Sequence, residues 1–161
     1  MSLHKMLSWT LVALWMALIF SLSHQPASQS SEMSSDITEA ILSAVEKAVP
    51  DLEGNMDSAE HIVRKNAHFI IYLILGALTV NALRTSGTRH NRRTVFAIGI
   101  CVLYAMSDEF HQLYVPGRSG ELRDVWIDSS GAAAGVFLYM FAEKALNRNI
   151  EKAFKAKEIE N

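Results

Sequence analysis

The residues best suited to chemistry lie in one short stretch, from Ser107 to Arg118. Within it stand two carboxylates, an imidazole and an amide: Asp108, Glu109, His111 and Gln112. Residues three or four positions apart share a helix face, and a carboxylate beside an imidazole can exchange protons near neutral pH. The stretch follows directly on the apolar run 95–106. Ionisable groups bordering a membrane segment are costly, so this stretch is a candidate functional site.

Three more polar clusters also border apolar segments. Their candidate ligand-binding residues, which join Gln112 and Arg118 of the first stretch, are His24 and Gln25, then Arg64, Lys65 and Tyr72, then Arg123, Asp124 and Asp128. His68, in the second of these clusters, is a candidate catalytic residue. Positions 64, 68 and 72 are four apart, which places these three side chains on one helix face. A lone charge in a membrane is unfavourable. We therefore expect the carboxylates of Asp108, Glu109 and Asp128 to pair with the cations at 64, 65, 118 and 123.

Four apolar segments must position these clusters. Half of the residues are hydrophobic, and they gather into predicted spans at about 6–23, 66–84, 94–114 and 124–143. The pattern predicts an all-α, polytopic membrane protein, a four-transmembrane-helix bundle formed by a single domain over 1–161. The alternative, a soluble helical domain, would need a larger core than this chain supplies.

The orientation follows from the basic residues. The connection 84–93 holds four arginines and no acidic residue, which favours the cytoplasmic side. An anionic lipid is a second use for these arginines, although orientation alone explains them. Both termini are then cytoplasmic, including the tail 144–161. The first segment has features of a cleaved signal peptide, but its length favours a retained anchor.

The connection 23–63 is the longest between predicted spans and lies outside in this orientation. Its Ser-, Gln- and Pro-rich part, 24–35, predicts an irregular linker. Apolar residues at helical spacing then predict an amphipathic helix between the first two spans, with Asp36 as its cap and Pro50 at its end. This extracytoplasmic helix would lie at the interface or on the end of the bundle.

The topology brings the four polar clusters to one membrane surface. In the fourth segment, Gly131 and Gly135 have the spacing that lets helices approach closely. Packing within the chain is the default use of this face, and a homo-oligomer is the second. The turn signal at Pro116 and Gly117 precedes Arg118 in the connection to that segment.

The polar clusters, taken in order, resemble those of the VanZ-like membrane proteins. The matching motifs are Ser23-His24-Gln25-Pro26, Arg64-Lys65-Asn66-Ala67-His68-Phe69, Ser107-Asp108-Glu109-Phe110-His111-Gln112, Pro116-Gly117-Arg118 and Asp124-Val125 with Asp128. Asp128 stands where many relatives would have Asn. The resemblance implies a bacterial inner membrane, a connection with the cell envelope and an antibiotic-resistance context, that of glycopeptides. It supplies no reaction.

We expect an outward-facing pocket that binds the anionic head group of a membrane lipid or a lipid-linked envelope precursor. The alternatives are a hydrolase or transferase with Asp108, Glu109, His111 and His68 as catalytic residues, and a purely structural or partner-binding role. A metal held by Asp108, His111, His68 and His24 is disfavoured because nearby arginines would repel it. A transporter would need polar groups through the depth of the membrane. We expect no cofactor, no metal and no nucleic-acid partner.

Overall fold

The computed structural model describes residues 2–48 and 56–160. Its regular structure is helical throughout these ranges, in agreement with the predicted all-α class. The helices are α1 (Leu3–Ser23), α2 (Ala27–Ala48), α3 (Met56–Thr85), α4 (His90–Gln112) and α5 (Leu122–Glu160). The predicted end of the amphipathic helix at Pro50 lies outside the described residues.

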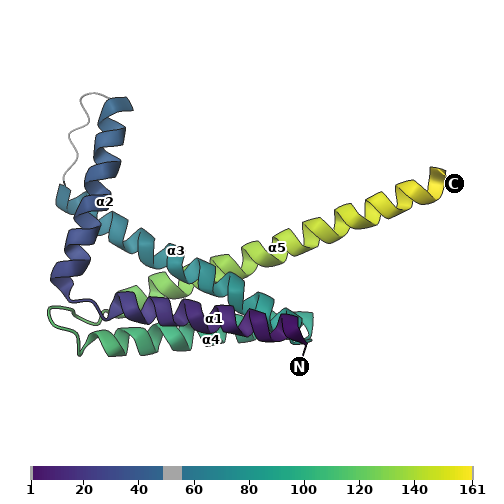
Figure 1. Cartoon of the computed structure of the whole chain (residues 1–161), viewed down its shortest axis with the longest axis horizontal. Coiled ribbons are helices and arrows are strands. Elements are labelled where there is room, and N and C mark those ends of the chain that lie inside the picture. The colour runs from purple at the N-terminus through teal and green to yellow at the C-terminus, as the bar shows by residue number, and fades with distance from the viewer. Residues whose placement is uncertain (1, 49–55, 161) are drawn as a thin grey trace.

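Helix α3 is the centre of the arrangement, because it packs against each of the other four helices. Figure 1 shows α1 and α4 running side by side along α3 and the first half of α5. Helix α2 leaves this bundle at one end, while the last part of α5 extends past the other end. The end of α1, the end of α4 and the start of α5 therefore lie near α2.

The interface between α3 and α5 depends on glycines. A Cβ added to Gly131 or Gly135 would overlap the backbone carbonyls of Phe69 and Leu73 on α3, and one added to Gly76 would overlap that of Ala132 on α5. Small residues allow such backbone contact between membrane helices. The predicted small-residue face is thus used within the chain. A homo-oligomer through this face stays a prediction. In such an oligomer, a helix of the second copy would have to replace α3 against Gly131 and Gly135.

Among the described residues, three helices are long and apolar enough to cross a membrane: Leu3–Ser23, His61–Thr85 and Leu122–Lys152. Helix α4 is not among them, because its apolar middle is flanked by Arg92 and Arg93 at one end and by Asp108 and Glu109 at the other. A crossing by α4, and with it the count of four spans, stays a prediction.

The predicted irregular linker at 24–35 is wrong, because α2 begins at Ala27. Pro26 directly precedes the helix, a position that suits the fixed φ of proline. Within the helix the Ser34 hydroxyl donates to the Ser30 carbonyl at 2.9 Å, so a serine-rich segment satisfies its side chains while remaining helical. Asp36 consequently lies inside the helix and does not cap it. The Ala27 N–H donates to the Pro116 carbonyl, which ties α2 to the connection before α5.

Helix α5 is longer than its predicted span, because the tail after residue 143 continues the helix to Glu160. Neither Gly nor Pro follows Gly135, so no residue breaks the helix. An ion pair one turn apart, from the Lys155 Nζ to the Glu151 Oε1 at 2.8 Å, supports the exposed part. Helix α3 also begins earlier than predicted, at Met56.

Candidate functional site

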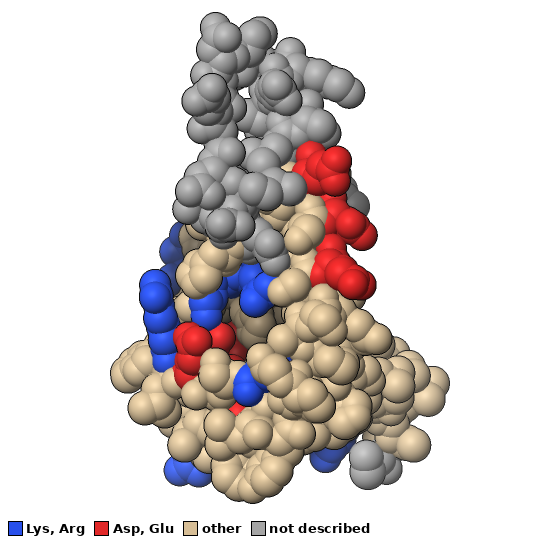
Figure 2. Space-filling model, turned by 90° about the vertical axis from the view of Figure 1, so that its left-hand side faces the viewer, with Lys and Arg blue, Asp and Glu red and all other residues tan. Residues whose placement is uncertain are grey.

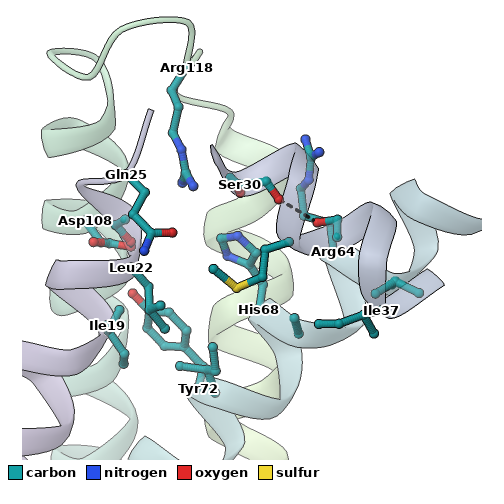
Figure 3. A pocket seen from close by; sticks show the side chains of 16 residues that line it. Ile19, Leu22, Gln25, Ser30, Ile37, Arg64, His68, Tyr72, Asp108 and Arg118 are labelled. Carbon is teal, nitrogen blue, oxygen red and sulfur yellow. Dashed lines mark hydrogen bonds between the residues drawn. The ribbon is translucent and has the colours of Figure 1, made fainter. Parts of the chain in front are cut away.

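A cavity of about 120 Å³ lies between α1, α2, α3 and α4 at the end of the bundle next to α2. Its polar lining includes Gln25, Arg64, His68, Tyr72, Asp108 and Arg118, which come from α3, α4 and the connections that precede α2 and α5. Figure 3 shows Arg118 reaching from the connection after α4 into the space between Asp108 and His68. Arg64, His68 and Tyr72, which were expected to share a helix face, all line the same cavity.

The rest of the cavity wall is apolar. It is formed by Ile19 and Leu22 of α1, Met33 and Ile37 of α2, and Ile71 of α3. Of these side chains, those of Ile19, Leu22 and Ile37 are labelled in Figure 3, and they lie below the guanidinium of Arg118 in that view. The cavity therefore has a charged end and a hydrophobic side, which is the surface that an amphiphilic molecule would complement.

Asp108 is a buried carboxylate held by neutral donors. It is 3% exposed, and its Oδ2 accepts hydrogen bonds from the Ser23 hydroxyl at 2.8 Å and from the Gln112 amide at 3.4 Å. Its Oδ1 has no partner among the described residues. The expected ion pair with an arginine is not formed among the described residues, and the carboxylate instead accepts hydrogen bonds from Ser23 and Gln112 at one of its two oxygens. Ser23 is the last residue of α1, whereas Gln112 lies one turn after Asp108 on α4 itself.

Ser23→Ala should lower the free energy of unfolding by about 1 to 2 kcal/mol, because a buried carboxylate would lose a hydrogen-bond donor. The measurement is denaturant unfolding in detergent micelles, followed by circular dichroism. Ser21→Ala is the matched control, since the Ser21 hydroxyl is exposed and bonds only within its own helix, to the Ala17 carbonyl. Equal stability of the two variants would contradict this role for Ser23.

His68 contacts a second buried carboxylate. Its Nδ1 lies 3.3 Å from the Oδ1 of Asp128, which is 0% exposed. Asp128 therefore pairs with this histidine and not with one of the predicted cations. The Tyr72 hydroxyl, also buried, has no hydrogen-bond partner among the described residues. His68 and Tyr72 face the cavity, and Asp128, which does not line it, is the carboxylate in contact with His68. Neither oxygen of Asp128 has a hydrogen-bond partner with good geometry among the described residues, so the contact is one of ion-pair distance.

A group of charged residues next to the cavity connects α3, α4 and α5. The Lys65 Nζ pairs with Asp124 and lies 3.7 Å from the Oε2 of Glu121. The backbone N–H of Glu121 donates to the Oε2 of Glu109 at 2.8 Å. Figure 2 shows basic and acidic side chains next to one another around a hollow at this end of the protein. Lys65, Glu109 and Asp124 thus fix the start of α5 and do not line the cavity.

His24 and His111 form a separate pair. The Nδ1 of His24 lies 3.2 Å from the Nε2 of His111, and the ring of Phe20 lies tilted against that of His111, with centroids 4.4 Å apart. Neither histidine lines the cavity. Arg123, another predicted ligand residue, is exposed and also outside the lining. Within 2–48 and 56–160, no group of three or more His, Cys, Asp or Glu side chains is arranged to hold a metal ion.

The prediction from sequence missed the contribution of α2. Ser30, Met33, Ser34 and Ile37 line the cavity, and their spacing of three and four residues is that of one helix face. This signal was present in the sequence. It was hidden because the segment up to residue 35 was interpreted as an irregular linker.

A bundle of long apolar helices with a polar cavity at one end defines a polytopic helical membrane protein. The chain belongs to the VanZ/LLP1 family, whose family model matches residues 8–143. The matched range contains every residue that lines the cavity. No curated protein and no solved structure matches the chain.

Proposed function

We propose that the cavity binds the anionic head group of an envelope lipid or lipid-linked envelope precursor in the bacterial cytoplasmic membrane. The observation that carries this function is the placement of Arg64 and Arg118 at one end of a cavity whose side wall is apolar. Arginine binds phosphate and carboxylate through two parallel N–H groups. The apolar wall would contact the hydrocarbon part of the same molecule.

The pKa shift of Arg118 supports an anionic ligand. Burial lowers the pKa of this guanidinium, the nearby Asp108 carboxylate opposes that shift, and Arg64 adds to it. An anion beside Arg118 would stabilise the charged form of this guanidinium and so offset the lowering of its pKa. The volume of about 120 Å³ is below the roughly 300 Å³ at which small-molecule pockets begin. The cavity would therefore take a phosphate or carboxylate group, with the rest of the molecule along the apolar wall.

The proposal includes four crossings, with the cavity on the outer side and both termini in the cytoplasm. Helix α4 supports this topology because Val95, Phe96, Leu103 and Met106 expose apolar side chains away from the bundle. Such a surface favours lipid over water as its surroundings. The arginines between α3 and α4 favour the cytoplasmic side, which leaves the cavity end outside.

Cysteine labelling tests this topology. The one cysteine, Cys101, is buried, so Cys101→Ala provides the background. Ser119→Cys, in the connection after α4, should react with a membrane-impermeant maleimide in intact cells. Thr88→Cys, before α4, should react only after the cells are lysed. Labelling of both positions from the same side would rule out a crossing by α4.

Native mass spectrometry of the purified full chain tests the ligand class. The probes are phosphatidylglycerol, undecaprenyl phosphate and, as the zwitterionic comparison, phosphatidylcholine, each added at equal concentration in detergent. We expect at least one of the two anionic lipids to bind about tenfold more tightly than phosphatidylcholine, as one additional charge-assisted contact would give. Equal binding of all three lipids would contradict the proposal and favour a structural role for the polar cluster.

The contact between His68 and Asp128 favours a second candidate, a membrane-embedded hydrolase or transferase. A histidine oriented by a carboxylate is a general base near neutral pH, and His68 faces the proposed head-group site. The same mass measurement would detect a product of changed mass from undecaprenyl phosphate or phosphatidylglycerol. Conversion by the wild type, with binding but no conversion by His68→Gln, would establish catalysis. The glycopeptide-resistance context of the family is compatible with either candidate.

A further inference from the structure

A second cavity lies at the opposite end of the bundle, between the first turn of α4 and the extended part of α5. It has a volume of about 570 Å³ and includes His90, Arg93, Lys144 and Arg148 in its lining. Figure 1 shows α5 leaving the bundle and extending beyond it, and residues of the first turn of α4 line the cavity together with this part of α5. This cavity is separate from the site near α2 and shares no lining residue with it.

The centre of this second site is the buried guanidinium of Arg93, which is 7% exposed. One of its terminal nitrogens lies 3.3 Å from the Oε1 of Glu143, and the other lies 2.8 Å from the Nδ1 of His90. Its Nε has no hydrogen-bond partner among the described residues. A buried arginine with an unsatisfied donor costs free energy, and an anion in the adjacent cavity would supply an acceptor.

The charge around the cavity favours an anion. Glu143 is shared by two arginines, since Arg84 lies 3.5 Å from the same carboxylate oxygen that Arg93 contacts. Glu151, the other acidic residue of the lining, is paired with Lys155. Over the described ranges, Lys144 and Arg148 form no ion pair. Both carboxylates are therefore neutralised, and the cations at 144 and 148 remain to attract a ligand.

The surroundings distinguish a lipid from a soluble anion. Met140 and Phe141 add apolar surface to the lining, and Phe141 is 72% exposed. The neighbouring apolar side chains Phe96 and Phe137 are also exposed. A head group among the cations would therefore have its glycerol and acyl part beside a hydrophobic helix surface. Basic pockets at the membrane boundary of transmembrane helices have this composition.

We propose that this cavity binds the phosphate of an anionic phospholipid in the leaflet next to the arginine-rich connection. The ligand chemistry is a phosphate ester, held by Arg93, Lys144 and Arg148. The site does not depend on the function proposed for the cavity near α2. It gives the extended end of α5 a role in fixing the protein against one membrane surface.

The test is lipid retention. The full chain is reconstituted in vesicles of phosphatidylglycerol and phosphatidylcholine in equal amounts, extracted with a polymer into lipid particles, and its retained lipids are measured by mass spectrometry. We expect phosphatidylglycerol to be enriched about tenfold around the wild type and to fall to parity in the double variant Lys144→Gln/Arg148→Gln. Lys152→Gln is the matched control, because Lys152 is an exposed lysine of the same helix outside the lining. Loss of enrichment in Lys152→Gln equal to that in the double variant would overturn the proposal in favour of diffuse charge attraction.

Two further measurements distinguish a lipid site from a soluble phosphate site and from loss of folding in the double variant. Glycerol 3-phosphate at millimolar concentration should leave the enrichment unchanged. Displacement of phosphatidylglycerol by it would mean a soluble phosphate site and overturn the lipid assignment. If the double variant unfolds, the two single variants Arg148→Lys and Arg148→Gln are used in its place. The thermal unfolding midpoint of each shows that it is folded. Enrichment retained in the lysine variant and lost in the glutamine variant supports the site, whereas equal enrichment in both overturns it.

Discussion

Gly135→Val will lower the free energy of unfolding by about 3 kcal/mol or more, the largest stability effect that we expect from one substitution. A Cβ at this position would overlap the carbonyl of Leu73, and backbone atoms cannot move aside as the end of a flexible side chain can. Helices α3 and α5 would have to separate, which removes close packing along their whole contact. Overpacking of this kind costs typically 1 to 3 kcal/mol, and more where backbone must shift.

Gly99→Val is the control for this variant. Gly99 is also a helical glycine, and a Cβ there meets no atom within 4 Å. Its substitution changes the same atoms while creating no overlap, so stability should remain within about 0.5 kcal/mol, the range of surface substitutions. Both variants are measured by denaturant unfolding in detergent micelles, with circular dichroism as the signal. Equal stability of the two would show that α3 and α5 do not depend on this close approach.

Arg118→Gln will weaken binding of an anionic lipid to the cavity near α2 by about ten- to a hundredfold. A hydrogen bond to a charged group is worth about 1.5 to 3 kcal/mol, and about 1.4 kcal/mol corresponds to a factor of ten in affinity. The side chain of Arg118 enters the cavity from a connection between helices (Figure 3). Its removal should therefore leave the bundle intact, and the thermal unfolding midpoint should change little.

Arg123→Gln provides the comparison, because Arg123 is an exposed arginine five residues away that does not line the cavity. Native mass spectrometry with phosphatidylglycerol and undecaprenyl phosphate gives the affinities of both variants. Equal weakening by the two substitutions would indicate attraction by overall charge instead of a site. Unchanged lipid binding in Arg118→Gln would contradict the proposal that this cavity is the binding site.

Much of the site was predictable because polarity and helical spacing are local properties of the chain. The four apolar segments and the polar residues at their ends indicated that the clusters would meet. Four of the residues that line the cavity, Gln25, Arg64, Tyr72 and Arg118, were predicted as ligand-binding residues, and two more, His68 and Asp108, as catalytic candidates. The three apolar helices long enough to cross a membrane correspond to the first, second and fourth predicted segments.

Other features depended on how the helices rotate and cross. Ser23 and Gln112 donate hydrogen bonds to one oxygen of Asp108, and Asp128 lies against His68. Charge alone had suggested arginine partners for both carboxylates. His111 shares a helix face with Asp108 by spacing, yet it contacts His24 outside the cavity. Residues three positions apart on a helix point in directions that differ by about 60°. The packing of the adjacent helices therefore decides which of the two, Asp108 or His111, lines the cavity.

The amino-acid sequence alone was sufficient for the helical class, the apolar segments and the gathering of polar residues at their ends. Only the tertiary structure decided that α2 forms a wall of the cavity, that α5 continues beyond the bundle, and which partner each buried carboxylate has. The reason is that hydropathy and periodicity act along one helix at a time. Partners across helices are set by their crossing, and here Gly76, Gly131 and Gly135 determine how closely α3 and α5 approach.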